Sequence, residues 1–306
     1  MGSSNVDLVV VGSVGVDTIE TPYAKCVDIL GGSASYACAA AVSYTTVGMV
    51  GVVGTDFPEA HEDCYASLGI NLEGLQKKEG NTFRWSGLYK NNMDERVTLS
   101  TELNVFADFS PELPPSYRQA PFIFLANIGP DLQLRVLDQI DRPRFVVMDT
   151  MDLWINIQRE KLMEVIGRVD LLTLNESEAR RLSGEHFLPV AANVLLDCGP
   201  KYVLIKKGEH GSMLFWKDGV FALPAYPLGN VIDPTGAGDA FAGGFMGSLA
   251  GCSNLDLDSL RTAMLHGSVT ASFAVESFSL DRLKLISSED IERRLAVYRE
   301  ILRLPD

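Results

Sequence analysis

This chain carries its most informative run at Asp233-Pro-Thr-Gly-Ala-Gly-Asp-Ala-Phe-Ala-Gly-Gly-Phe-Met246. Three small residues leave the backbone N–H groups accessible, namely Gly236, Ala237 and Gly238. The acidic residue Asp239 follows them directly. The Ala-, Gly- and Phe-rich residues after it are typical of a buried helix. Backbone N–H groups at a helix start point at an anion, and the helix dipole favours negative charge there. An acid does not belong in a loop that only holds an anion. Asp239 therefore indicates proton removal within reach of a phosphate, as in phosphoryl transfer to a hydroxyl.

The same run resembles, at every position, the second signature of the ribokinase-like carbohydrate kinases, also called the phosphofructokinase B family. The resemblance implies ATP-dependent phosphorylation of an alcohol group on a sugar, nucleoside or related small molecule. Asp239 would be the general base, and the γ-phosphate would lie on the N–H groups of Ala237 and Gly238, after the turn at Gly236. A glycine-rich turn that only opens a core helix is the structural alternative, and it leaves Asp233 unexplained.

Composition limits the classes of partner. Of the 306 residues, 46% are hydrophobic and 22% are charged, as in a globular protein. The formal net charge of −14 argues against a nucleic acid or an anionic membrane as partner. The sequence shows neither a transmembrane-length apolar run nor a signal-peptide pattern. The cysteines are scattered and form no C-x-x-C pair, so we expect reduced thiols in a cytoplasmic protein that binds a small molecule.

Apolar runs of strand length alternate with segments of helix length. Candidate strands are 8–11, 46–53, 122–126, 145–149, 171–175, 202–206 and 212–216. Candidate helices are 34–42, 59–68, 131–139, 158–169, 176–182, 240–249, 257–273 and 288–302, with Asp56 as the expected cap of helix 59–68. Apolar strands separated by helices indicate a mainly parallel sheet covered on both faces. We therefore expect a ribokinase-like three-layer α/β/α sandwich that forms one domain over residues 1–306.

Two segments break this pattern, at about 14–30 and 82–106. The second segment alternates, with every second residue from Phe83 to Tyr89 on the same side of an extended strand: Phe83, Trp85, Gly87 and Tyr89. This pattern suggests half-buried antiparallel strands. The resemblance implies that both segments form a small β-sheet lid over the substrate. In relatives such lids often pair, so a homodimer through the lid is a further expectation. An ordinary surface hairpin is the alternative.

The first strand is followed by Gly12, Gly15 and Asp17. The G-x-x-G spacing lacks the full dinucleotide fingerprint, so it does not favour a dehydrogenase. The resemblance implies that Asp17 binds substrate hydroxyls, and a carboxylate can accept from two adjacent hydroxyls. A turn-capping aspartate is the alternative.

The run from Gly31 and Gly32 to Cys38 resembles the family's G-G-x-x-x-N-x-A segment, which contacts the substrate. Tyr36 stands where the family usually has a sugar-contacting Asn, so the match disfavours a plain ribose or fructose. Tyr36 could donate one hydrogen bond and stack on a ring, or it could be a core aromatic. Asn104, where the second lid segment returns to the body, is a candidate substrate contact or a turn residue.

Asn175 and Glu178 match the family's N-x-x-E motif at the end of a strand. The spacing places both side chains on one side of a helix start. The resemblance implies that Asn175 orients the nucleotide and that Glu178 holds Mg2+ through water. A capping box has the same spacing and is the alternative.

Lys206, Gly208 and Gly211 lie in a turn between two strands and resemble the family's turn along the nucleotide. The two glycines allow close backbone approach, and Lys206 would reach a phosphate. A plain β-hairpin is the alternative.

The helix 257–273 corresponds to the one that flanks adenine in relatives, with Gly267 and Ser268 as candidates for the adenine wall. Asp233 and Thr235 match positions near a monovalent cation in relatives, so K+ joins ATP and Mg2+ among the implied cofactors. The loop after this helix is short and lacks the usual glycine. No P-loop pattern, G-x-x-x-x-G-K-[ST], occurs in the chain.

The acceptor remains open between a sugar or inositol and a nucleoside. The run around Asp233 and the short first lid segment look similar to archaeal-type nucleoside kinases, whereas Tyr36 replaces the residue that contacts a sugar. A nucleotide-binding regulator without catalysis is a more distant alternative.

Overall fold

The computed structural model describes residues 6–90, 93 and 96–303, so the second lid segment includes positions outside the described part. Its main sheet has nine strands in the order β13-β12-β11-β10-β9-β8-β1-β4-β5. The bounds are β1 Leu8–Val11, β4 Val47–Gly54, β5 Asn71–Lys78, β8 Phe122–Leu125, β9 Phe145–Met148, β10 Leu171–Asn175, β11 Tyr202–Lys206, β12 Ser212–Trp216 and β13 Gly219–Leu223. All neighbours from β11 to β5 are parallel, and β12 and β13 add an antiparallel edge. The mainly parallel sheet is therefore confirmed.

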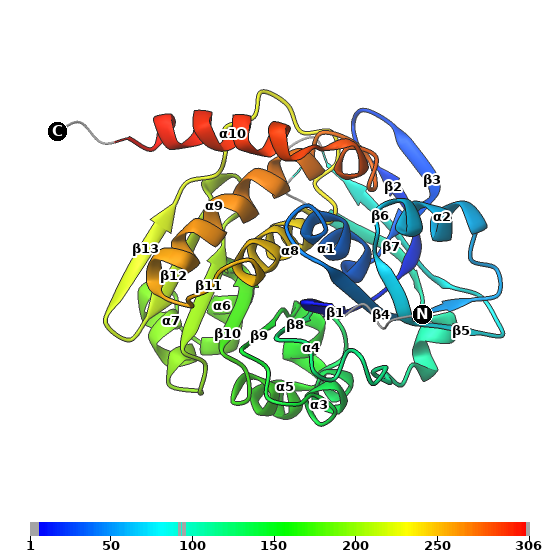
Figure 1. Cartoon of the computed structure of the whole chain (residues 1–306), viewed down its shortest axis with the longest axis horizontal. Coiled ribbons are helices and arrows are strands. Elements are labelled where there is room, and N and C mark those ends of the chain that lie inside the picture. The colour runs from blue at the N-terminus through cyan, green and yellow to red at the C-terminus, as the bar shows by residue number, and fades with distance from the viewer. Residues whose placement is uncertain (1–5, 91–92, 94–95, 304–306) are drawn as a thin grey trace.

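Alternation along the strands divides the core into two halves. In β1, Leu8 and Val10 belong to one buried cluster, and Val9 and Val11 belong to the other. Since side chains of a strand alternate between faces, each cluster fills one face of the sheet. Figure 1 shows helices on both sides, which confirms the three layers.

The first face is covered by α1 Ser33–Ala41, α2 Glu59–Ser67, α8 Ala237–Ala250, α9 Leu257–Ala274 and α10 Ser288–Ile301. The second face is covered by α3 Pro130–Leu137, α4 Asp152–Ile157, α5 Arg159–Ile166, α6 Glu176–Ser183 and α7 Leu188–Leu196. Short 3-10 turns occur at η1 Asn104–Asp108, η2 Gly208–His210 and η3 Leu283–Leu285. Among the described helices, none has both the length and the apolar character that a membrane crossing requires.

Helix α8 lies at the centre of its layer between α1 and α9 (Figure 1). Its glycines make this close packing possible. A Cβ on Gly243 would lie 2.2 Å from the Ala37 carbonyl oxygen of α1, and one on Gly244 would lie 2.6 Å from Thr270 Oγ1 of α9. The small residues of this run therefore let the middle of α8 pack closely between α1 and α9.

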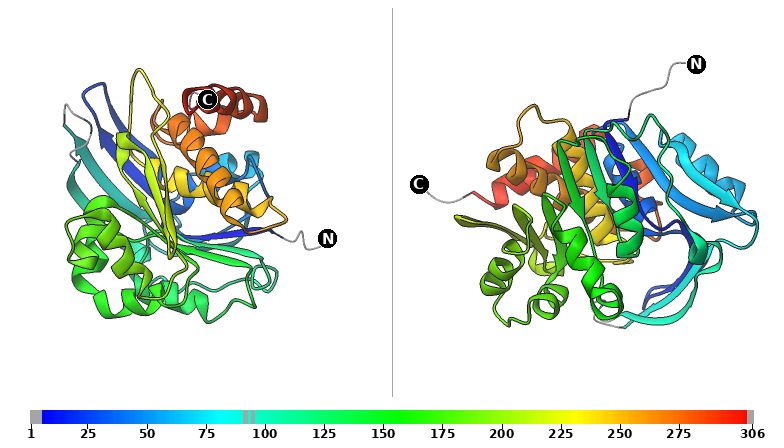
Figure 2. Two further views of the ribbon diagram at one scale, coloured as in Figure 1. Left: turned by 90° about the vertical axis from the view of Figure 1, so that its left-hand side faces the viewer. Right: turned by 90° about the horizontal axis from the view of Figure 1, so that it is seen from below.

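A separate four-stranded sheet has the order β3-β2-β6-β7 and stands beside the main sheet (Figure 2). It consists of β2 Gly15–Glu20, β3 Lys25–Gly31, β6 Phe83–Tyr89 and β7 Arg96–Glu102. Pairs β2–β3 and β6–β7 are antiparallel, and β2–β6 is parallel. Both segments that broke the α/β pattern thus meet in one small sheet, as expected.

Asp56 does not cap α2, and that expectation was wrong. Pro58 is the N-cap residue and makes no side-chain cap bond. Asp56 Oδ1 instead accepts hydrogen bonds from the N–H and hydroxyl of Thr82, at 2.6 and 2.7 Å. The turn after β4 lies beside the residue that precedes β6, so Asp56 connects the main sheet to the small one.

Candidate active site

The turn before α8 sets the direction of its first N–H groups. Gly236 is the N-cap residue and has a left-handed backbone, with φ 73°. The helix begins at Ala237, three residues earlier than the expected start at Ala240. Ala237 N–H already donates to Pro234 O at 3.2 Å. Gly238 and Asp239 fall in the first turn, where N–H groups lack acceptors within the helix and suit an anion.

Three carboxylates approach one another in front of this turn. Asp17 is 4% exposed and lies on β2, where Gly31 of β3 leaves room for it, since a Cβ on Gly31 would lie 1.9 Å from Asp17 Oδ2. Burial raises the pKa of Asp17 to about 7, and the charges of Asp233 and Asp239 add to this rise. Asp17 Oδ1 has no hydrogen-bond partner among the described residues. The structure thus brings together an unpaired acceptor and the expected general base.

Tyr36 lies beside the same carboxylates. Its side chain is 1% exposed, and its hydroxyl is unpartnered within the described part of the chain. Burial raises the pKa of Tyr36 well above its ordinary value, and the charges of Asp233 and Asp17 raise it further. The hydroxyl is therefore a neutral donor facing acidic groups, available to a ligand that supplies an acceptor.

Asp239 occupies the third position of α8 and is half-buried. Burial raises its pKa to about 7, the charge of Asp149 raises it further, and Lys206 and Arg96 oppose the rise. A pKa near neutrality suits a general base, because it combines a usable deprotonated fraction with a real affinity for the proton. The environment of Asp239 therefore fits the chemistry inferred from the run.

Asn175 and Glu178 form both hydrogen bonds of a capping box at the start of α6. Asn175 Oδ1 accepts from Glu178 N–H at 2.9 Å, and Glu178 Oε2 accepts from Asn175 N–H at 2.7 Å. Glu178 is 6% exposed, and burial together with the charge of Asp149 raises its pKa to about 7, against the effect of Lys206. The capping box is thus present, and it holds the Glu178 carboxylate near Asp149 and Lys206.

Asp149 is the residue of this site that the sequence reasoning missed. It follows β9 directly, is 4% exposed, and lies with its Oδ2 2.6 Å from Lys206 Nζ at the end of β11. The available signal was an acid at the carboxyl end of an apolar strand, because such strand ends gather at the ligand-binding edge of a parallel sheet.

Asp233 is fully buried. Its Oδ1 accepts from Thr235 N–H at 2.9 Å, and its Oδ2 has no partner among the described atoms. Burial raises its pKa to about 6, although the hydrogen bonds from Thr235 oppose the rise. The Thr235 hydroxyl donates to the Tyr89 hydroxyl of β6 at 3.1 Å. This last bond joins the small sheet to the loop before α8.

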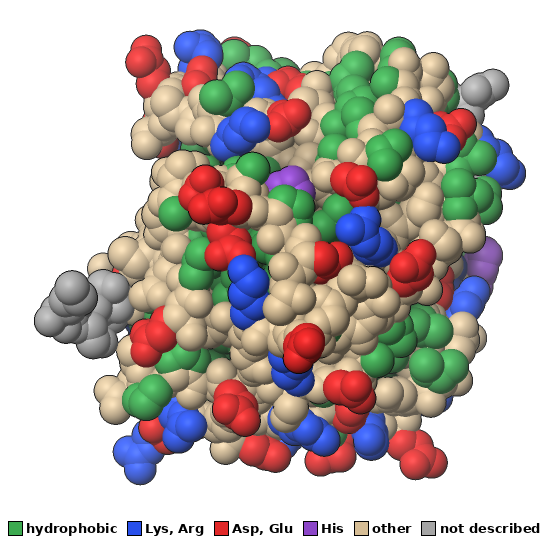
Figure 3. Space-filling view, turned by 90° about the vertical axis from the view of Figure 1, so that its right-hand side faces the viewer, with side chains coloured by type: hydrophobic (Ala, Val, Ile, Leu, Met, Phe, Trp, Pro, Cys, Tyr) green, Lys and Arg blue, Asp and Glu red, His purple; other side chains and the backbone are tan. Residues whose placement is uncertain are grey.

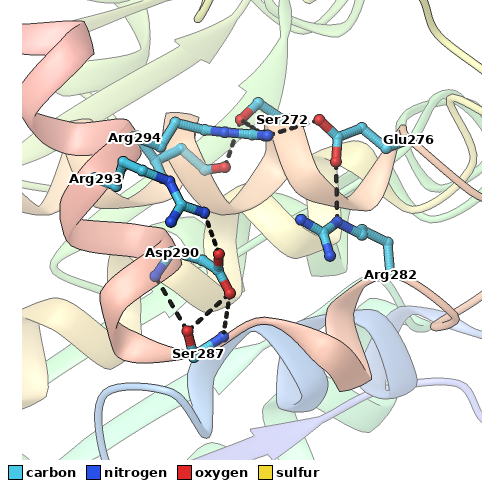
Figure 4. Close-up of polar contacts among 8 residues, drawn as sticks. Ser272, Glu276, Arg282, Ser287, Asp290, Arg293 and Arg294 are labelled. Atoms are coloured by element: carbon cyan, nitrogen blue, oxygen red, sulfur yellow. Dashed lines mark hydrogen bonds and ion pairs between the residues drawn. The ribbon is translucent and has the colours of Figure 1, made fainter.

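The turn after α9 supports the Asp233 segment from behind. Ile232 N–H donates to the Val275 carbonyl at 2.8 Å. Figure 4 shows Arg294 reaching from α10 to Ser272 and Glu276, at 2.9 and 2.7 Å, while Arg282 binds the other side of Glu276 at 3.0 Å. This network ties the turn to α9 and α10, and it thereby fixes the segment on which Asp233 lies.

Four other expected site residues have structural reasons for their identity. Gly208 and Gly211 take positive φ in the β11–β12 turn, and a Cβ on Gly211 would lie 2.0 Å from Leu223 O. Gly267 packs against α8, where a Cβ would lie 2.7 Å from Phe241 O. Ser268 Oγ lies 3.2 Å from the Tyr298 hydroxyl. Their contacts with a nucleotide stay predictions.

Gly32 and Asn104 also have evident local roles. Gly32 has φ 99°, and a Cβ there would lie 2.4 Å from Ser13 O. Asn104 begins η1 with φ 49° and donates from its side-chain amide to Thr82 O at 2.9 Å. The amide of Asn104 is thus already engaged, and its substrate contact stays a prediction.

Comparison with known proteins identifies the class. The pfkB family carbohydrate kinase profile matches residues 6–284. The chain therefore belongs to the pfkB family of carbohydrate kinases and is an ATP-dependent kinase that acts on a hydroxyl of a sugar or nucleoside. This finding excludes the dehydrogenase alternative.

Known proteins of similar sequence and similar structure are nucleoside kinases and ribokinases. The chain is 32% identical over 272 residues to a cytidine kinase of Thermococcus kodakarensis, covering 85% of this chain and 96% of that protein. It is 27% identical to a nucleoside kinase of Methanocaldococcus jannaschii, over 75% of this chain and 73% of that protein. The crystal structure of that nucleoside kinase matches with a TM-score of 0.76 at 21% identity, over 96% of this chain and 99% of that one. A ribokinase structure from Giardia lamblia matches with a TM-score of 0.81 at 20% identity, over 96% and 100%.

Proposed function

We propose that this kinase phosphorylates a hydroxyl of a nucleoside, with a pyrimidine ribonucleoside such as cytidine as the first candidate. The observation that carries the acceptor class is the similarity to a cytidine kinase over 96% of that protein's length. Tyr36 stands at the usual position of a sugar-contacting Asn, and its buried hydroxyl, which has no partner in the described part of the chain, supports a contact with the acceptor that differs from the usual one. Sugars and inositols belong in the same test, because the family also acts on carbohydrates.

Asp239 performs proton transfer in this proposal. The acceptor hydroxyl gives its proton to the Asp239 carboxylate while its oxygen attacks the γ-phosphorus of ATP, and the bond to the β-phosphate oxygen breaks to release ADP. The N–H groups of the first α8 turn, with Gly238 best placed, hold the phosphoryl oxygens. Asp17 Oδ1 accepts from an acceptor hydroxyl, which supplies the partner that this buried atom lacks.

Mg2+ is proposed to be held through water. Within the described ranges, no three His, Cys, Asp or Glu side chains are arranged to bind a metal directly. Glu178 is buried beside Asp149 and suits a second layer around hydrated Mg2+. When bound to ATP, Mg2+ neutralises phosphate charge.

K+ near Asp233 and Thr235 is a separate proposal. The buried Oδ2 of Asp233 would gain a partner from a cation. Val275 O, however, already accepts from Ile232 N–H and lies 3.4 Å from Asp233 N. We expect at most a several-fold loss of activity when K+ is replaced by a bulky organic cation at equal ionic strength. A strict requirement for K+ would contradict this arrangement.

The small sheet is proposed to act as a lid within a single domain of residues 1–306. The hydrogen bond between Tyr89 and Thr235 would let a lid movement reach the phosphate loop.

The outer strand β7 is exposed along its whole length, with Val97 39% and Leu99 55% exposed. Figure 3 shows hydrophobic side chains in several small groups between scattered charged side chains on one side of the molecule. We propose that β7 pairs with a second copy, which Leu99→Lys should weaken in light-scattering measurements of mass.

The activity is tested by ADP release from Mg-ATP and K+ with a panel of nucleosides, sugars and inositols. We expect strong release with one class of nucleoside. ADP release with sugars alone would overturn the nucleoside proposal. ATP binding without release on any acceptor would support the regulator alternative. We also propose a cytoplasmic location, which is supported by the use of ATP and by cysteines that form no disulfide among the described residues.

A further inference from the structure

Asp149 and Lys206 form the most buried ion pair of the described site. Their side chains are 6% and 17% exposed, and the distance between Asp149 Oδ2 and Lys206 Nζ is 2.6 Å. Asp149 directly follows β9, and Lys206 is the last residue of β11. These two strands lie on either side of β10 in the sheet. A buried pair of this kind rarely adds stability over apolar residues, because both charges lose their hydration. The pair is therefore better explained by a function than by stability.

Asp149 is fixed on its own side. Its Oδ1 accepts from Thr150 N–H at 2.9 Å, which leaves Oδ2 for the lysine. The Asp149 carbonyl accepts from the buried Gln133 side-chain amide at 3.0 Å, and the same amide donates to Ala126 O at 3.1 Å. Gln133 thus holds the ends of β8 and β9 together. The carboxylate has little freedom to move.

The side chain of Lys206 reaches the start of α8. A Cβ on Gly238 would lie 3.3 Å from Lys206 Nζ, so the ammonium is beside the first turn of the helix. A cation at a helix N-terminus is unfavourable, because the dipole places positive charge there. Asp149 compensates part of this cost. An anion between the ammonium and the first N–H groups would compensate the rest, so the arrangement is that of a site for an anion.

The charge of Lys206 depends on its partners. Burial disfavours the charged form, but Asp149 and Glu178 outweigh it, and the pKa of Lys206 lies above its ordinary value. Lys206 is therefore a fixed positive charge next to Asp239, rather than a proton donor. It would stay protonated throughout the reaction.

We infer that Asp149 is a positioning residue for phosphoryl transfer, because it holds the Lys206 ammonium against the first turn of α8, where the transferred phosphoryl group lies. The inference rests on the phosphoryl transfer of the proposed function and does not depend on which acceptor is used. As the acceptor proton passes to Asp239 and the bond to ADP breaks, Lys206 neutralises the charge on the phosphoryl oxygens. Asp149 acts on the phosphoryl group only through Lys206; its charge also raises the pKa of Asp239, so kcat is compared well above pH 7, where Asp239 is deprotonated in every variant.

A double-mutant cycle tests this dependence. Asp149→Asn keeps a similar shape and an acceptor for Thr150 but removes the charge. We expect it to lower kcat about 10–100-fold, with KM for ATP changed less than about 3-fold, because the contact acts in the transition state. In a Lys206→Met background, Asp149→Asn should cost less than about 3-fold, because the residue it serves is gone. Lys207→Met removes the neighbouring lysine and should change kcat less than about 2-fold.

Equal losses in both backgrounds would overturn the inference. So would a Mg2+ concentration for half-maximal activity that rises with Asp149→Asn in both backgrounds, since Asp149 would then serve the metal. Asp149→Glu restores the charge and should recover part of the loss. A variant with Glu that is no better than Asn would contradict the charge argument.

Binding gives a readout that needs no acceptor. Calorimetry with ADP and fluoroaluminate, which mimics the transferred phosphoryl group, should show the same coupling in Kd, whereas Kd for ADP alone should change little. Thermal unfolding checks that the variants are folded. Failure of every acceptor with wild type would count against the nucleoside proposal. Loss of the coupling in fluoroaluminate binding would count against the role of Asp149.

Discussion

The ring of Tyr36 lies directly against Gly236, so that a Cβ on Gly236 would lie 2.3 Å from Tyr36 Cγ. Tyr36 comes from α1, and Gly236 forms the N-cap of α8. The contact therefore joins the segment expected to bind the acceptor to the turn expected to bind phosphate. Both the position and the backbone of Gly236 exclude any larger residue.

Gly236→Ala should be severely impaired. The left-handed backbone costs about 1–2 kcal/mol for a non-glycine residue, and the Cβ collides with Tyr36. Displacement of the first α8 turn should lower kcat about 100-fold, as when an oxyanion donor is lost. Thermal unfolding and steady-state kinetics measure both effects. Gly229→Ala is the control, because its Cβ would meet nothing within 4 Å. Near-normal kcat in Gly236→Ala would refute the role of this turn.

Tyr36→Phe should leave stability nearly unchanged, because the hydroxyl it removes is buried without a partner in the described structure. It should lower kcat/KM for the true acceptor about 10-fold, since a hydrogen bond to the ligand is lost. An acceptor analogue without the matching hydroxyl should be unaffected. Tyr65→Phe is the control: its hydroxyl lies 2.6 Å from Ser35 Oγ, so it should lose stability without changing acceptor preference. Equal effects of Tyr36→Phe on both acceptors would rule out the contact.

Activity should rise with pH through neutrality. The base must be deprotonated, and burial together with Asp149 raises the pKa of Asp239 to about 7. Below that pH, kcat/KM should fall about tenfold per unit. Asp149→Asn should move this acid limb to lower pH, because it removes a negative charge and leaves Lys206. A profile that stays flat from about pH 5.5 to 9, with chemistry rate-limiting, would contradict the assignment.

Stability should change with pH in the opposite sense. Three buried carboxyl groups have pKa values of about 7, namely those of Asp17, Glu178 and Asp239. In unfolded chains the same groups have pKa values of about 4. Between about pH 4 and 7 the folded protein therefore binds more protons than the unfolded chain. Their contribution to stability is present at low pH and is lost as pH rises through about 7. His61 and His266, with lowered pKa values, oppose this trend only below about pH 6.5.

The melting temperature of the ligand-free protein should therefore fall as pH rises from about 6.5 through about 7, by about 2–4 °C for each kcal/mol lost, and level off by about pH 8. The double variant Asp17→Asn and Asp239→Asn should flatten the slope. An unchanged slope in that variant would show that these carboxylates do not control the effect.

Most candidate site residues could be named from the sequence because they lie in contiguous runs, and their roles stay predictions. The start of α6 illustrates this: Asn175 and Glu178 form the predicted pair, and the alternative capping box also exists. The start of α8 was predicted three residues late, because Gly236 takes the left-handed conformation and lets the helix begin at Ala237. That backbone state has no distinct signature in a glycine-rich run.

Residues brought together by topology were harder to predict. Asp149 looked like the last residue of a strand, and its partner Lys206 is far along the chain. Only the sheet order β9-β10-β11 brings the ends of β9 and β11 close to each other across β10. Helix α7 was missed because Pro189 interrupts an otherwise apolar run, although proline is well tolerated in the first turn of a helix.

In the proposed mechanism, Asp239 removes the acceptor proton. The most direct measurement is ADP release by Asp239→Asn with the best acceptor, together with calorimetry of an ATP analogue. We predict that turnover falls at least about 1000-fold, while the Kd of the analogue stays within about 3-fold. Turnover close to that of wild type, with intact binding, would contradict the mechanism and require another base.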